Sequence, residues 1–118
     1  MVLNHLAVRV PDVGEARRFY ERYFGFQFGY ERGNGVVLKG DGGFYLALDP
    51  LNSGEHVEFP SWFHFGFCLK NPAAVRDLFQ TLRGAGIEMI GDLVEYGNDA
   101  VNFYCCSPGG YRLEVFAT

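Results

Sequence analysis

The chain has 118 residues, a length that suits one domain or two small units that share a core. Its formal net charge is −4 with both signs interspersed, which excludes the basic face typical of nucleic-acid binding. No apolar run is long enough to span a membrane, and the N-terminus has no signal-peptide pattern. With 3 cysteines a disulfide framework is not expected, so we predict a cytoplasmic protein.

The first half of the sequence predicts a strand, a helix and three more strands. Residues 4–10 (NHLAVRV) alternate, with Leu6 and two valines on one face and His5 on the other. Asp12, followed three residues later by Glu15, is a helix-capping pattern. A helix should therefore begin at residue 13 and end before Gly25. Turn signals then separate the expected strands 26–32, 35–39 and 43–48.

The second half repeats this order after a polar segment, 50–60, that we interpret as a linker. Residues 62–69 (WFHFGFCL) alternate again, and Asn71-Pro72 is a typical helix start. Strands are expected at 87–90, 93–96, 101–106 and in the closing stretch 107–116 (SPGGYRLEVF), which opens with a turn.

An internal repeat becomes visible when the sequence is shifted by 59 residues. His5 then falls on His64, Arg17 on Arg76 and Gly25 on Gly84. A strand–helix–strands unit therefore occurs twice, which predicts an α+β fold. We expect each helix to cover the apolar face of its own sheet, leaving the histidine-bearing faces to line a shared cleft.

Glu114 is an unusual residue for the middle of an apolar strand. Strand interiors disfavour glutamate, and a buried carboxylate needs a partner. Side-chain alternation places Glu114 on the face away from the helix, as it does His5 and His64 in their own strands. Two imidazoles and one carboxylate suit a divalent transition metal and leave coordination positions open.

The residues alone also allow other interpretations. A histidine on a strand is often a hydrogen-bonded packing residue, and Glu114 could instead form an ion pair with Arg112. We interpret His56, which lies beside Glu55 in the linker, as a solvated loop residue. Cys105 and Cys106 should point to opposite faces of their strand as small core thiols.

The stretches NHLAVRVPDVGEARRFYERYFGF and NFYCCSPGGYRLEVF resemble the opening and closing signatures of the vicinal-oxygen-chelate superfamily. That superfamily includes glyoxalase I, extradiol dioxygenases, fosfomycin-resistance thiol transferases and bleomycin-resistance proteins. The resemblance implies one glyoxalase-like domain over 1–118, with module 1 at about 1–49 and module 2 at about 61–118. Each module would be a βαβββ unit, and together they would form a curved mixed sheet around a cleft, with the helices outside.

The resemblance also implies a site. His5, His64 and Glu114 would be the ligands of a divalent metal ion, either Fe, Mn, Ni, Co or Zn, and the chain would form a homodimer. Glyoxalase I has a fourth ligand, a glutamate on the last strand of its first module. Here the matching positions are Tyr45 and Ala47, so that activity is not favoured.

Fosfomycin-resistance enzymes have a hydroxyl-bearing residue at the position of Ala7 and a substrate-contacting tyrosine at the position of Tyr104. Whether Tyr104 faces the cleft depends on the length of the turn after Ser107, because a shift of one residue reverses the face.

We therefore expect a metal-dependent lyase, dioxygenase or thiol transferase that chelates a small oxygenated organic substrate. Tyr104 would be a catalytic hydrogen-bond donor, and Tyr45 and Trp62 would contact the substrate. Neither nucleic acid nor a membrane is an expected partner. The alternative is metal-independent binding and sequestration of a drug, as in the bleomycin-resistance proteins.

Overall fold

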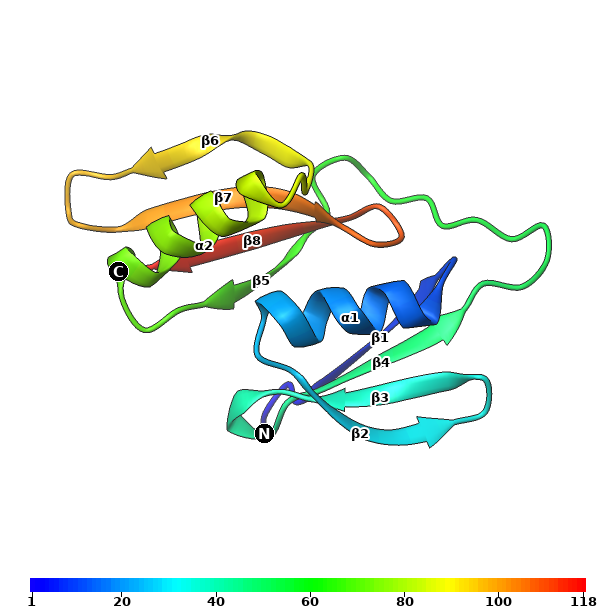
Figure 1. The fold of residues 1–118 in the computed structure, drawn as a ribbon. Coiled ribbons are helices and arrows are strands. Elements are labelled where there is room, and N and C mark those ends of the chain that lie inside the picture. The colour runs from blue at the N-terminus through cyan, green and yellow to red at the C-terminus, as the bar shows by residue number, and fades with distance from the viewer. The chain divides into compact units, whose positions relative to one another are not determined.

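The computed structural model describes all residues, 1–118, and divides them into two compact units, Met1–Glu58 and Phe59–Thr118. Each unit contains one α-helix and one four-stranded mixed sheet (Figure 1). This is the α+β arrangement of two modules that the repeat predicts. No helix in the structure is long and apolar enough to cross a membrane.

The N-terminal unit has the strand order β1-β4-β3-β2, in which β1 and β4 are parallel and the other neighbours antiparallel. Its elements are β1 (His5–Val10), α1 (Val13–Tyr23), β2 (Gln27–Arg32), β3 (Gly35–Lys39), the 3₁₀ turn η1 (Asp41–Gly43) and β4 (Tyr45–Pro50). The side chain of Asp12 caps α1 by accepting a hydrogen bond from the backbone N–H of Glu15 at 3.0 Å.

The core of this unit lies between α1 and one face of its sheet. Ala16, Phe19 and Tyr20 of the helix are buried, as the apolar spacing predicts. They face the sheet, where Leu46 and Leu48 are almost completely buried. Each such leucine contributes about 1.5–3 kcal/mol of burial energy. The other face of β1, which carries His5, is therefore the face without a helix.

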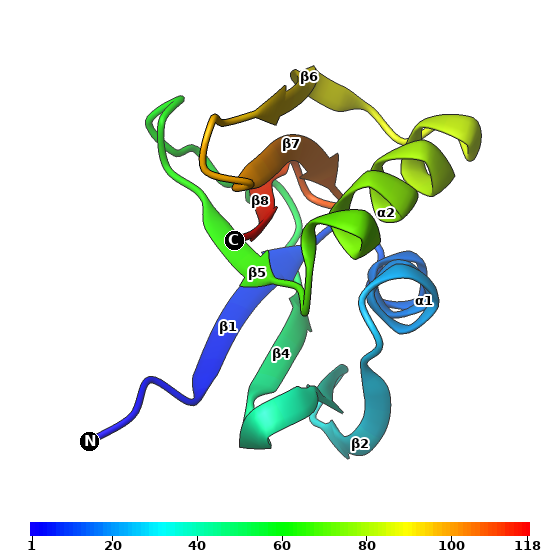
Figure 2. The same ribbon diagram turned by 90° about the vertical axis from the view of Figure 1, so that its left-hand side faces the viewer.

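The C-terminal unit repeats this plan with the strand order β5-β8-β7-β6. Its elements are β5 (Phe65–Cys68), α2 (Pro72–Gly84), β6 (Met89–Glu95), β7 (Val101–Ser107) and β8 (Tyr111–Ala117). Asn71 caps α2 through the backbone N–H of Ala74 at 2.8 Å. The helix packs on β7 and β8 (Figures 1 and 2), and the rings of Phe79 and Phe103 meet edge to face at 5.4 Å.

Several predicted boundaries differ from the structure. The strand expected over 62–69 begins only at Phe65, so His64 lies directly before β5 and not within a strand. The strands expected at 87–90 and 93–96 form one strand, β6, which has a register shift between Ile90 and Val94. Gly91 lies within this irregularity at φ 76°, so it bends the strand without ending it. Pro50, which we assigned to the linker, is the last residue of β4.

The turn between β7 and β8 determines which residues of the two strands share a face. Ser107 pairs with Tyr111, and the Gly110 N–H donates to the Ser107 carbonyl at 3.0 Å. Gly109 and Gly110 both have positive φ angles, which glycine adopts without steric cost. This register places Tyr104 directly opposite Glu114, so the two side chains lie on the same face of the sheet.

Candidate functional site

Glu114 lies on β8, between β5 and β7, on the face of the sheet that α2 does not cover. Its neighbours in sequence, Leu113 and Val115, are fully buried on the opposite face. On β5 the residue paired with Glu114 is Gly66. A Cβ atom at position 66 would lie 2.7 Å from the backbone oxygen of Glu114 and 3.1 Å from its Cβ. The glycine therefore gives β5 the close approach to β8 that this pairing requires.

The two carboxylate oxygens of Glu114 have different surroundings. Oε2 accepts a hydrogen bond from the Asn102 side-chain amide at 2.8 Å and another from the Tyr104 hydroxyl at 3.1 Å. Asn102 accepts in turn from the Tyr96 hydroxyl at 3.3 Å. We call these four residues, Tyr96, Asn102, Tyr104 and Glu114, the Glu114 network. Two donors on a single oxygen hold the carboxylate in one orientation.

Tyr104 is held as a neutral donor. Burial raises the pKa of its hydroxyl, and the hydrogen bond to Glu114 and the negative charge of that carboxylate raise it further, while Arg112 lowers it. The guanidinium of Arg112 lies 4.4 Å from the centre of the Tyr104 ring, a cation–π contact. Arg112 therefore stacks on the tyrosine, and the ion pair with Glu114 that the sequence allowed is not formed.

His64 presents one ring nitrogen to Glu114. Its Nδ1 lies 2.9 Å from the backbone oxygen of Trp62, and its Nε2 lies 3.7 Å from Glu114 Oε1. A carbonyl can only accept, so Nδ1 carries the hydrogen and Nε2 keeps a lone pair when the ring is neutral. Two acceptor atoms then face each other, an arrangement that a cation placed between them stabilises.

The same local arrangement occurs at His5 in the N-terminal unit. His5 is exposed on the helix-free face, and its Nδ1 donates to the side-chain oxygen of Asn4 at 2.8 Å, which leaves Nε2 available. Its partner in the parallel β1–β4 pair is Tyr45, also exposed, so the two side chains share a face. Both histidines thus have Nδ1 engaged by a nearby oxygen.

The residues present fit a divalent metal in their chemistry. Ligand atoms that share a first-row metal at bond lengths near 2.1 Å lie about 3–3.5 Å apart, close to the 3.7 Å between His64 Nε2 and Glu114 Oε1. Within each unit, no group of three or more histidine, cysteine, aspartate or glutamate side chains is arranged to hold a metal ion. The C-terminal unit therefore supplies two donors, and the third in our prediction, His5, belongs to the N-terminal unit.

The register identifies which residue of the first module corresponds to Glu114. The 59-residue shift that relates the two modules takes Ala7 to Gly66. Ala7 pairs with Ala47 in the parallel β1–β4 pair, just as Gly66 pairs with Glu114 in the parallel β5–β8 pair. Of the two positions that the sequence left open, Tyr45 and Ala47, the equivalent is Ala47. It carries a methyl group where the second module carries a carboxylate.

The structure brings together some of the predicted residues and adds others. His64, Tyr104 and Glu114 are neighbours, and the rings of His64 and Tyr104 meet edge to face at 5.4 Å. Trp62 is 72% exposed, and the contact that it makes with His64 is through its backbone oxygen. His56 is exposed and lies 3.2 Å from the Glu58 carboxylate, as expected of a loop residue.

Sequence reasoning missed Asn102 and Tyr96. The signal for Asn102 was a polar residue two positions before Tyr104, and so on the same strand face, in the otherwise apolar run VNFYCC. It became meaningful only once the register of β7 and β8 was known.

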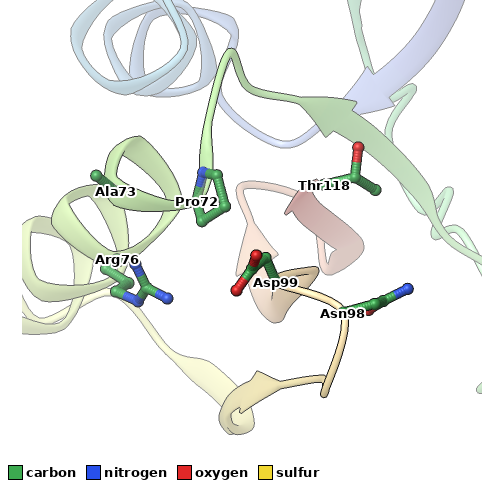
Figure 3. Close-up of a pocket in the computed structure, with 6 residues that line it drawn as sticks. All are labelled: Pro72, Ala73, Arg76, Asn98, Asp99 and Thr118. Carbon is green, nitrogen blue, oxygen red and sulfur yellow. The ribbon is translucent and has the colours of Figure 1, made fainter.

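A separate pocket of about 510 Å³ lies beside the start of α2 in the same unit. Figure 3 shows Arg76 reaching towards it from the helix, and Asn98 and Asp99 on the turn between β6 and β7. Pro72, Ala73 and Thr118 complete its lining. Arg76 is engaged in an ion pair with Glu95, and no residue of the Glu114 network lines this pocket.

Comparison with known proteins identifies the family. Residues 2–115 match the model of the Glyoxalase/Bleomycin resistance protein/Dioxygenase superfamily. The chain belongs to this superfamily. The resemblance of its two end signatures to the vicinal-oxygen-chelate proteins is thereby confirmed. Members of the glyoxalase superfamily commonly use divalent metals and bind small molecules.

Individual relatives agree with this assignment. A possible glyoxalase from Bacillus cereus is 34% identical, with a TM-score of 0.79 over 98% of this chain and 97% of that one. The fosfomycin-resistance protein FosX from Listeria monocytogenes has a TM-score of 0.83 over 100% of this chain and 93% of its own, at 15% identity, so it shares the fold. An uncharacterized protein of Pseudomonas aeruginosa is 32% identical over 71% of this chain, a match that spans 65% of the relative.

Proposed function

We propose that this glyoxalase-superfamily chain is a metal-dependent enzyme that binds a small organic substrate through two neighbouring oxygen atoms. His5, His64 and Glu114 would hold the divalent metal. When bound, the metal would supply Lewis-acid stabilisation of negative charge on substrate oxygen. The observation that carries the proposal is the pair of facing acceptors, His64 Nε2 and Glu114 Oε1, separated by 3.7 Å.

The protein residues have distinct parts in this function. Trp62 fixes the His64 ring through its backbone oxygen and leaves Nε2 for ligation. Tyr104, kept neutral by burial and by Glu114, has one hydroxyl hydrogen, which it donates to Glu114 Oε2 here and would donate to the substrate when one is bound. Tyr45, exposed next to His5, and Trp62, with its exposed indole, would contact the substrate.

The absence of a carboxylate at position 47 bears on the reaction class. In glyoxalase I the corresponding glutamate is a fourth ligand and takes part in proton transfer. Ala47 can do neither, so we favour dioxygenase or thiol-transferase chemistry over glyoxalase I chemistry. An activity screen with catechols, epoxides and thiol adducts of methylglyoxal would distinguish these classes.

Metal binding by the purified protein tests the proposal. We expect metal-free protein to bind one Mn²⁺, Co²⁺, Ni²⁺ or Zn²⁺ ion per chain and to melt at a higher temperature with the metal present. His64→Ala and Glu114→Gln should each abolish this gain. His56→Ala is the matched control, because His56 is a loop histidine outside the site. Wild-type protein with no metal and no gain in melting temperature would contradict the proposal.

The double variant His5→Ala/His64→Ala separates enzyme from drug-binding protein. If the chain is a metalloenzyme, the variant should lose both metal and turnover. A variant that binds a screened drug as tightly as wild type, without metal, would instead establish sequestration.

A further inference from the structure

The Glu114 carboxylate is asymmetric in a way that the metal proposal does not require. Oε2 accepts two hydrogen bonds, from Asn102 and Tyr104, while Oε1 points to His64. A carboxylate that bound a cation through both oxygens would have to share Oε2 among the cation and two donors. Oε2 is therefore fixed by two hydrogen bonds, and Oε1 is the oxygen that faces His64 and is available to a metal.

Asn102 is the part of this arrangement that has no other evident purpose. Its side chain is buried, with 8% of the residue exposed, although strands disfavour asparagine. It pairs with Phe116 across the β7–β8 ladder, so it reaches Glu114 diagonally on the same face. A buried polar residue on a strand costs stability unless both ends of its amide are satisfied.

Both ends of the Asn102 amide are satisfied, and in only one orientation. A carboxylate can only accept, so the nitrogen end must face Glu114, where it donates at 2.8 Å, and Oδ1 then accepts from the Tyr96 hydroxyl at 3.3 Å. Reversing the amide would place Oδ1 against the carboxylate, acceptor against acceptor. The acceptor-only carboxylate thus determines which way the Asn102 amide faces, the Tyr96 hydroxyl anchors the oxygen end of the amide, and the anchored amide holds Glu114 Oε2.

We propose that Asn102 is a positioning residue that makes Glu114 bind metal through one oxygen, Oε1. This inference rests on the proposed function. One-oxygen binding by Glu114 occupies one coordination position and leaves another for the second oxygen of a chelating substrate. Tyr104 shares the task, but its hydroxyl also faces the site, whereas Asn102 acts only through Glu114.

Cobalt binding by the whole protein tests this inference without an assay of turnover. In Asn102→Leu, a substitution of similar branched shape without a donor, we expect Co²⁺ affinity measured by calorimetry to fall by about tenfold. The visible spectrum of bound Co²⁺ should change as well, because a freed Oε2 alters the coordination number. Asn98→Leu, the same substitution on the β6–β7 turn, should leave both measurements unchanged.

Tyr96→Phe is the second variant, because Tyr96 is 49% exposed and the loss of its hydroxyl should leave the fold intact. In this variant Asn102 loses the hydrogen bond that anchors its oxygen end but keeps the one it donates to Glu114, so we expect a smaller fall in affinity, about threefold, with a spectral change in the same direction. If the folded variants keep the wild-type affinity and spectrum, the role of Asn102 is overturned while the proposed function stands. Absence of Co²⁺ binding in the wild-type protein would overturn the proposed function and this inference with it.

Discussion

At the scale of single residues, successive side chains of β7 point alternately to the site and to the core. Tyr104 faces the site, and burial followed by the contact with Glu114 raises the pKa of its hydroxyl. Its neighbour Cys105 faces the core and is fully buried, and that burial raises the pKa of its thiol to about 12. Cys106 returns to the other face and is partly exposed. The expected opposite orientation of the two thiols is confirmed, and the buried one is chemically inert at neutral pH.

The buried thiol predicts a loss of stability in alkaline solution. Below pH 9 Cys105 is protonated in both states, but above its ordinary pKa of 9.0 only the unfolded chain releases the proton. The thiol therefore lowers the free energy of unfolding between pH 9 and 12, by about 1.4 kcal/mol at pH 10. Urea denaturation at pH 8 and pH 10 should show a smaller loss for Cys105→Ala than for wild type. Cys68→Ala, which removes an exposed thiol, is the control; equal losses in all three proteins would contradict this prediction.

At the scale of elements, the β5–β8 pair carries most of the geometry of the site. Glu114 is on β8, His64 precedes β5, and Gly66 allows the two strands to meet. The distance between His64 and Glu114 therefore depends on the closeness of this pairing.

A side chain at position 66 should disturb this pair. Alanine there would place Cβ 2.7 Å from the backbone oxygen of Glu114, a contact that the backbone can relieve only by moving. We expect Gly66→Ala to cost about 1–3 kcal/mol of unfolding free energy and to weaken metal binding. The same substitution at Gly84, the last residue of α2 with open space around it, should stabilise by up to about 1 kcal/mol. A Gly66→Ala protein as stable as wild type in thermal melts would refute the steric argument.

Local signals predicted the elements, whereas the site depended on long-range register. The caps at Asp12 and Asn71 and the alternation around Val8 are encoded within a few residues, so they could be identified from the sequence. Which face of the sheet Tyr104 occupies depends on the length of the β7–β8 turn, and two adjacent glycines in the sequence do not determine that length. The strand expected over 62–69 starts too early, because the alternation continues back into residues 62–64, which have no strand partner.

At the scale of the whole molecule, the two modules are joined by a long exposed segment. Residues 51–64 contain no helix or strand, and nearly all of them are exposed. The boundary between the two compact units falls within this segment, between Glu58 and Phe59. Each module has its own helix and buried core on either side of it.

This segment predicts a specific pattern of proteolysis. It contains Glu55 and Glu58 but no lysine or arginine, since none occurs between Lys39 and Lys70. A glutamate-specific protease should therefore cut first here and give two fragments of nearly equal size, because exposed loops are the preferred sites of nicking. Trypsin, which has no site in the segment, should leave it intact. Early cleavage at Glu31 or Glu95, which lie in strands, would contradict this expectation when the fragments are weighed by mass spectrometry.

Ala47 has a consequence for charge. Two neutral imidazoles and one carboxylate supply a single negative charge, so a divalent cation held by His5, His64 and Glu114 would keep one positive charge. A carboxylate in place of Ala47 would cancel it. If His5, His64 and Glu114 hold a metal as proposed, a methyl group at position 47 would leave the site most receptive to a ligand that arrives as a singly charged anion, such as a deprotonated catechol or a hydroxy acid.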